Sequence, residues 1–142
     1  MKCGLLGRKL GHSYSPQIHA CLGDYSYTLF EKEPEEVADF LKSGDFTGLN
    51  VTIPYKLDVM PYLTDISREA RIIGAVNTIH FTDHGTFGYN TDYGGFGRSL
   101  DHAGIGIKEK NCVVLGSGGG ARAIIQYLAD SGAKSITVGS RH

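Results

Sequence analysis

The chain has 142 residues, of which 41 % are hydrophobic and 20 % are charged, and its formal net charge is −1. This length suits one ordinary domain, or one domain and part of another. The near-neutral charge, without a basic cluster, predicts no nucleic-acid partner and no attraction to an anionic membrane surface. No apolar run approaches the ~20 residues that cross a bilayer, so we expect no membrane partner and a cytoplasmic location.

The residues that commonly bind metals show no ligand pattern. The three cysteines, Cys3, Cys21 and Cys112, are widely spaced and have no histidine at ligand distance. The six histidines share no common spacing either, so none is assigned a chemical role. We therefore expect neither a disulfide framework nor a metal site.

Strand and helix patterns alternate through the first half of the chain. Period-two apolar runs predict strands, and apolar positions at a 3.6-residue spacing predict helices. Ser15 followed by Pro16 has the form of a helix N-cap with proline at the first helical position. In chain order, the expected elements are strand 3–7, helix 16–22, strand 25–30, helix 33–42, strand 46–53, a short helical piece 57–63 and helix 65–73 closed by Gly74. Two strands, 76–81 and 86–89, then flank a turn and predict a hairpin.

This alternation predicts an α/β fold. The first part should form a mainly parallel sheet covered by helices, with an antiparallel edge. Helix 91–103 should follow, and then a new unit: strand 112–115, loop 116–120, helix 121–130 and strand 135–138. Helix 121–130 is expected to bury one face, formed by Ala121, Ile124, Ile125, Leu128 and Ala129. We therefore divide the chain into a first domain at 1–90, a connecting helix at 91–104 and an incomplete Rossmann-type β-α-β unit at 105–142.

One stretch, Asn50-Val51-Thr52-Ile53-Pro54-Tyr55-Lys56, is expected to end a strand at a binding site. Polar and apolar residues alternate up to Pro54, which removes a ladder hydrogen bond and turns the chain. Lys56 should then lie beside Asn50 and Thr52, where a small polar ligand could be held. The alternative for a lysine after a strand is an ordinary solvated surface residue.

Three further features suggest polar recognition. Ser13 and Ser15 present two hydroxyl groups at a helix N-terminus, where a carboxylate is favoured, although Ser15 could be a cap only. Asn77 interrupts an apolar strand, so its amide should bond either backbone or ligand. Asp92 stands at a strand-to-helix junction, where it is either a helix cap or a functional carboxylate.

The loop Gly116-Ser117-Gly118-Gly119-Gly120-Ala121 stands between a predicted strand and a predicted helix. In that setting glycines allow a tight turn and close approach of a diphosphate, and free amides at the helix start bind the phosphates. The alternative is a glycine-rich turn without a ligand. Ser140-Arg141 ends the second strand where an acidic residue would favour NAD, and a guanidinium there suits the 2′-phosphate of NADP. Arg141 could equally be a solvated terminal residue.

Five motifs in this order resemble shikimate dehydrogenase and its quinate/shikimate relatives. The motifs are Gly11-His12-Ser13-Tyr14-Ser15-Pro16, Asn50 to Lys56, Gly74-Ala75-Val76-Asn77-Thr78, Gly88-Tyr89-Asn90-Thr91-Asp92, and Gly116 to Ala121. The resemblance runs the full length of this chain, but chains of that family are about twice as long, so this sequence looks like their N-terminal half.

The resemblance implies a role for each of these residues. Ser13 and Ser15 would hold the substrate carboxylate, and Asn50, Thr52, Asn77 and Asp92 would bind ring hydroxyls. Lys56, paired with Asp92, would exchange the proton in the NADP-dependent, reversible reduction of 3-dehydroshikimate to shikimate in aromatic amino-acid biosynthesis. Gly116, Ser117, Gly118, Gly119, Gly120, Ala121, Ser140 and Arg141 would bind NADP.

Two alternatives stay open for the 142-residue chain itself. One β-α-β unit cannot bury both faces of its sheet, so the chain alone should be an inactive shikimate-binding module, and a homodimer is among its expected states. A regulatory homologue that binds the ligand without turnover is the other alternative. An intact Lys56 and Asp92 count against it.

Overall fold

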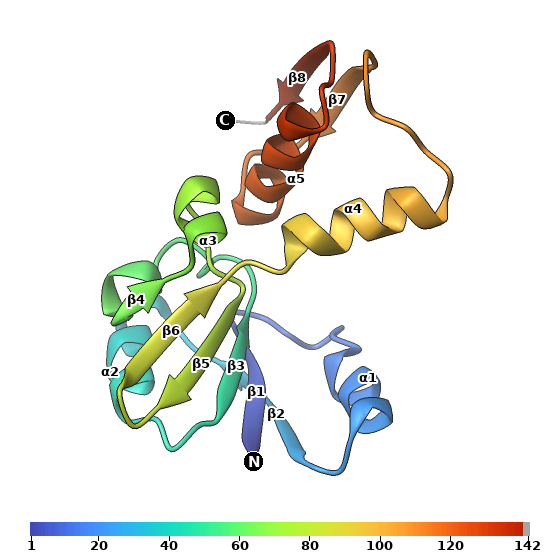
Figure 1. Cartoon of the computed structure of the whole chain (residues 1–142). Helices are drawn as coiled ribbons and strands as arrows, with labels where there is room; N and C mark the ends of the chain where they lie inside the picture. The colour runs from blue at the N-terminus through green and yellow to red at the C-terminus, as the bar shows by residue number, and fades with distance from the viewer. Residues whose placement is uncertain (141–142) are drawn as a thin grey trace.

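The computed structural model describes residues 1–140, so the predicted role of Arg141 falls outside the described residues. Two sheets of very different size are joined by the long helix α4, Asp92–His102 (Figure 1). The first sheet holds six strands and the second holds two. No helix within residues 1–140 is long and apolar enough to cross a membrane.

The first sheet is mixed, with the strand order β2-β1-β3-β5-β6-β4. Its strands are β1 Lys2–Gly7, β2 Ser26–Glu31, β3 Gly48–Val51, β4 Asp65–Ile66, β5 Thr78–Thr82 and β6 Gly85–Tyr89. Strand β1 pairs in parallel with β2 and β3, and β4 pairs in parallel with β6. Strands β3, β5 and β6 pair antiparallel to one another in turn, which confirms the predicted hairpin. The mainly parallel α/β class is therefore as expected.

The sequence pattern suggested that the antiparallel strands form the edge of the sheet, but they do not. Strand β4 pairs outside β6 and forms that edge instead. Residues Asp65 and Ile66 were expected to begin a helix, but they pair with Phe87 and Gly88. Ser67 then caps helix α3, Arg68–Ile73, by accepting a hydrogen bond from the Ala70 amide. Gly74 closes α3 with φ +68°, the left-handed conformation expected of a C-cap glycine.

The main core lies on one face of this sheet. Alternate residues of the strands, including Leu6, Leu49, Val51 and Ile79, are buried there with relative exposures of at most 2 %. Val37 and Leu41 on helix α2, Val37–Lys42, pack against them. Helix α2 was expected to begin at Glu33, but a 3-10 helix at Pro34–Glu36 precedes it because Pro34 and a capping box favour a tight first turn.

Two other helical predictions need correction. The piece predicted at 57–63 is helical only as a 3-10 helix at Met60–Tyr62, since Pro61 cannot sit in a longer hydrogen-bonded helix. Helix α1, Ser15–Leu22, has Tyr14 at its N-cap position, so Ser15 is the first helical residue and not the cap. The Ser13 hydroxyl accepts the Ser15 amide at 3.2 Å and takes over part of the capping role.

The second unit consists of β7 Asn111–Leu115, α5 Gly119–Asp130 and β8 Ser135–Gly139, and its two strands are parallel. Helix α5 starts at Gly119, two residues earlier than predicted. Its buried positions include Ala123 and Leu128, whereas Ala129 is exposed, contrary to the predicted face. The face is rotated because α5 packs not only on its own strands but also on Ile73 and Ala75 of the first unit.

Candidate active site

A cavity of about 800 Å³ opens where strands β1 and β3 end. All seven side chains proposed to act on the substrate line it: Ser13, Ser15, Asn50, Thr52, Lys56, Asn77 and Asp92. Lys56 is therefore not a solvated surface lysine, because its side chain is only 14 % exposed.

Sheet topology explains why such distant segments meet. Asn50 on β3 is opposite Thr78 on β5, and Thr78 is opposite Tyr89 on β6. Because β5 runs antiparallel to β3, its start lies at the edge where β3 ends, and the end of β6 lies there too. One end of the sheet therefore holds the residues that follow β1 and β3, the residue before β5 and the residues after β6.

Lys56 and Asp92 form an ion pair inside this cavity. The Lys56 Nζ donates to the Asp92 Oδ2 at 2.6 Å, and the Asp92 side chain is 33 % exposed. Asp92 is also the first residue of α4, where the partial positive charge of the helix N-terminus favours a carboxylate. Partial burial and a charge-assisted hydrogen bond hold the ammonium at a fixed point on the cavity wall.

Asn77 fixes the other side of Asp92. Its amide nitrogen donates to the Asp92 Oδ1 at 2.8 Å and to the Thr91 hydroxyl at 2.9 Å. Its oxygen accepts the Thr91 amide at 2.9 Å and the Thr78 hydroxyl at 3.1 Å. Asn77 is 7 % exposed, the buried polar residue that the sequence pattern had marked as needing partners. One oxygen of Asp92 therefore faces Asn77 and the other faces Lys56.

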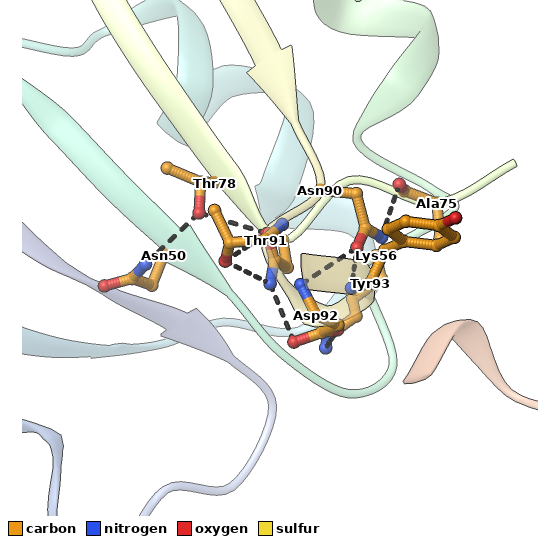
Figure 2. Close-up of polar contacts among 9 residues, drawn as sticks. Asn50, Lys56, Ala75, Thr78, Asn90, Thr91, Asp92 and Tyr93 are labelled. Atoms are coloured by element: carbon orange, nitrogen blue, oxygen red, sulfur yellow. Dashed lines mark hydrogen bonds and ion pairs between the residues drawn. The ribbon is translucent and has the colours of Figure 1, made fainter. Parts of the chain in front are cut away.

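Asn90 and Thr91 belong to this network but were not predicted as site residues. The Asn90 side-chain oxygen accepts the Asp92 amide at 3.0 Å and the Tyr93 amide at 3.3 Å, and its nitrogen donates to the Ala75 carbonyl at 3.0 Å (Figure 2). Asn90, which precedes the N-cap residue Thr91, thereby satisfies two amides at the start of α4 and sets the position of Asp92. An asparagine two residues before a helical aspartate is a capping signal that was available in the sequence.

A residue of strand β2 holds the loop that contains Ser13 and leads to Ser15. The Ser13 amide donates to the Leu10 carbonyl at 2.8 Å, and the Leu10 amide donates to the Glu31 Oε1 at 2.6 Å. Glu31 itself lines the cavity, as do Lys9 and His12. The cavity is therefore polar and carries charges of both signs, which suits a small ligand that bears a carboxylate and hydroxyl groups.

The glycine-rich loop joins β7 to α5 at the ends of the second pair of strands. Gly116 has φ +118° and its amide donates to the Gly139 carbonyl at 2.7 Å, so a residue with a side chain would be strained at this turn. A Cβ atom added to Gly118 or Gly120 would meet no other atom within 4 Å, so packing inside the protein does not require either glycine. Close approach of a diphosphate to the free amides at the start of α5 would require a glycine at position 118, the second glycine of the fingerprint, so this position fits a dinucleotide.

The other described residues predicted to bind the cofactor lie near this loop. The Ser117 and Ser140 hydroxyl groups are 3.0 Å apart, which brings the end of β8 against the loop. Ala121 lies in the first turn of α5. Within residues 1–140, no His, Cys, Asp or Glu side chains gather in a group that could hold a metal ion.

Comparison with known proteins identifies the relatives of this chain. The protein-family model described as the shikimate dehydrogenase substrate binding domain matches residues 5–79. The chain belongs to the shikimate dehydrogenase family. A shikimate dehydrogenase (NADP(+)) from Clostridium beijerinckii is 49 % identical over 97 % of this chain and 54 % of its own length.

Solved shikimate dehydrogenases share the fold as well as the sequence. Shikimate dehydrogenase 1 from Peptoclostridium difficile superposes with a TM-score of 0.94 at 40 % identity, over 100 % of this chain and 56 % of the other. A shikimate 5-dehydrogenase from Thermus thermophilus, solved in complex with NADP(H) and shikimate, gives a TM-score of 0.89 at 36 % identity, over 99 % of this chain and 56 % of the other. The chain thus spans about half the length of the relatives it matches.

Proposed function

We propose that the protein containing this chain catalyses the NADP-dependent, reversible reduction of 3-dehydroshikimate to shikimate. The observation that supports this most directly is the Lys56–Asp92 pair, 2.6 Å apart on the wall of a cavity that Ser13 and Ser15 also line. An acid–base group and a carboxylate-binding end within one small cavity are what a hydroxy acid and its ketone require. The Thermus thermophilus relative was solved with both shikimate and NADP(H).

Each lining residue receives a role in this proposal. Ser13 and Ser15 hold the substrate carboxylate by hydrogen bonds, and Asn50, Thr52 and Asn77 bind the ring hydroxyls. Lys56 donates its proton to the ketone oxygen during reduction and recovers a proton from the hydroxyl during oxidation. Asp92 orients the ammonium and binds a hydroxyl. NADPH, when bound, supplies the hydride that reduces the ketone carbon.

The proposed cofactor site begins in this chain. Gly116, Ser117, Gly118, Gly119, Gly120 and Ala121 would hold the diphosphate, and Ser140 with Arg141 would bind the 2′-phosphate. In this scheme residues 1–90 form the substrate-binding domain, residues 91–104 the connecting helix and residues 105–142 part of the nucleotide-binding domain. A homodimer and a cytoplasmic location remain predictions.

A second function is proposed for the 142-residue chain on its own: it binds shikimate without turnover. Leu115 and Val113 on β7 are 86 % and 69 % exposed while Val114 between them is buried, so one face of the two-stranded sheet is uncovered within residues 1–140. A nucleotide site built on so small a sheet lacks the packing that would hold its loop rigid. The substrate cavity, in contrast, is lined entirely by residues 5–92.

Isothermal calorimetry with separate ligands tests both proposals. Shikimate should bind the 142-residue chain, and Lys56→Ala should weaken but not abolish this binding. Oxidation of shikimate should appear only in the complete protein, followed as NADPH absorbance. Absence of shikimate binding by the chain and of turnover by the complete protein would overturn the dehydrogenase proposal, and NADP-dependent turnover by the chain alone would overturn the binding-module proposal.

A further inference from the structure

Tyr27 on strand β2 lies behind the cavity wall and contacts two of the residues that form it. Its hydroxyl donates to the Asn50 Oδ1 at 2.7 Å. A hydrogen-bonding effect of the Ser15 side chain acts to lower the pKa of this phenol, so Ser15 is its second polar neighbour. Asn50 and Ser15 both line the cavity, at the places proposed for a ring hydroxyl and for the substrate carboxylate. One phenol thus connects the two ends of the proposed substrate site.

The tyrosine reaches Asn50 by crossing a strand. Strand β1 lies between β2 and β3, with Cys3 opposite Tyr27 and Leu5 opposite Asn50. Residues two apart on a strand share a face, so Tyr27, Cys3, Leu5 and Asn50 are on the same face of the sheet. The ring therefore extends over β1 and brings its hydroxyl to the Asn50 amide.

Helix α1 holds the Tyr27 ring in this position through His19. The His19 ring stacks on the Tyr27 ring with centroids 3.7 Å apart and an interplanar angle of 16°. The His19 Nδ1 and the Tyr25 hydroxyl are 2.6 Å apart, which fixes the imidazole in turn. Ser15 and His19 are one turn apart on α1, so both face the same tyrosine. Tyr27 therefore has little freedom to choose another partner.

The phenol keeps its proton under all ordinary conditions. Burial raises the pKa of Tyr27 to about 12, although the hydrogen bond with Ser15 acts in the opposite direction. Because the phenol proton goes to the Asn50 Oδ1, the amide nitrogen of Asn50, a residue that lines the cavity, is directed to the Thr78 hydroxyl at 3.5 Å. An asparagine without this contact could rotate its amide and present its oxygen instead.

We propose that Tyr27 is a positioning residue that orients the Asn50 amide to donate a hydrogen bond to a ring hydroxyl of shikimate. This inference rests on the function proposed above. Tyr27 acts through Asn50 and does not itself touch the substrate. It makes the site selective for ligands that carry a hydrogen-bond acceptor at that position, since the amide nitrogen has already been turned toward it.

A double-mutant cycle on the 142-residue chain tests the proposal, with shikimate affinity measured by calorimetry. Tyr27→Phe should weaken shikimate binding about 5- to 10-fold, the usual net effect of one hydrogen bond. In the Asn50→Ala background the same substitution should change affinity by less than about twofold, because the residue through which Tyr27 acts is absent. Tyr62→Phe is the control: it removes a phenol hydroxyl from a side chain that is 45 % exposed and does not line the cavity, and it should leave affinity unchanged.

The complete dehydrogenase gives a second readout. Tyr27→Phe should raise the KM for shikimate while kcat stays within about threefold, as expected when binding is lost equally in the ground and transition states. Equal affinity of Tyr27→Phe and the parent chain, or an equal loss in the presence and absence of Asn50, would overturn the proposal while the proposed function stands. A parent chain that binds no shikimate, together with a complete protein that does not turn it over, would overturn both.

Discussion

Gly119, the first residue of helix α5, rests directly on the stem of Lys56. A Cβ atom added to Gly119 would lie 2.9 Å from the Lys56 Cβ and 3.2 Å from its Cδ. The glycine-rich loop and the lysine proposed for proton transfer are therefore in van der Waals contact, although they belong to different sheets. A displacement of α5 toward Lys56 would therefore press on the lysine side chain.

Gly119→Ala should lower activity through this contact. The new methyl group must displace either α5 or the Lys56 stem, which separates the ammonium from Asp92. We expect kcat of the complete dehydrogenase, at saturating NADP and shikimate, to fall roughly 10- to 100-fold, since small misplacements of a catalytic group have effects of this size. Gly95→Ala, in helix α4, is the control, because a Cβ atom there would meet nothing within 4 Å. Equal kcat values for the two variants would show that the contact does not position Lys56.

Lys56→Ala should remove the proton donor while leaving the fold intact. Turnover of the complete enzyme should drop at least ~100-fold, the usual contribution of a general acid–base group. Asp92 would keep its hydrogen bond from Asn77, so the melting temperature should change little. Steady-state rates and thermal melts measure the two effects, with Lys134→Ala at an exposed site as control. A rate within tenfold of the parent would exclude Lys56 from proton transfer.

Asn77→Ala should destabilise the fold as well as the site. Its buried amide holds Thr91, Thr78 and Asp92, and its loss leaves the Thr91 amide without its partner. We expect the free energy of unfolding, from urea denaturation, to fall by about 2–4 kcal/mol. Asn111→Ala, which removes one exposed hydrogen bond with Ser135, should cost less than about 1 kcal/mol. Similar losses for the two variants would contradict the central place given to Asn77.

The raised pKa of Tyr27 predicts loss of stability in alkali. The folded pKa is about 12 against an ordinary value of 10.0, so the unfolded chain releases this proton first. The contribution is fully present below pH 10.0 and is lost as the pH rises toward about 12. In urea denaturation across that window, Tyr27→Phe should show a shallower fall in unfolding free energy than the parent. Tyr14→Phe, on a side chain that is 75 % exposed, should keep the slope of the parent. Identical slopes for Tyr27→Phe and the parent would refute this assignment.

Much of the fold was predictable because its signals are local. Pro54 after alternating residues marked the end of the third strand to within two residues, since β3 is Gly48–Val51 and not 46–53, and Gly74 marked the end of α3. The turn before Gly85 marked the hairpin. These signals act through backbone geometry within a few residues, so one stretch of sequence contains them completely.

The features that sequence patterns missed depend on contacts between distant segments. Asp65 and Ile66 form a strand only because β6 offers a partner, and two residues carry no periodicity of their own. Ala129 is exposed because α5 turns its apolar face partly toward Ile73. Lys56 and Asp92 were paired through the family resemblance, and neither stretch alone indicated that their side chains would lie 2.6 Å apart. Tyr27 gave no signal, since it reaches Asn50 only across β1.

The turn of the β5–β6 hairpin lies at the end of the sheet away from the candidate active site. The strands leave the cavity at Thr78 and return to it at Tyr89, so the turn between Thr82 and Gly85 lies at the opposite end (Figure 1). That turn is closed by its own hydrogen bond from the Thr82 hydroxyl to the Gly85 carbonyl. A fluorescent label or a short peptide inserted between Asp83 and His84 would therefore lie away from the substrate cavity and should not obstruct it.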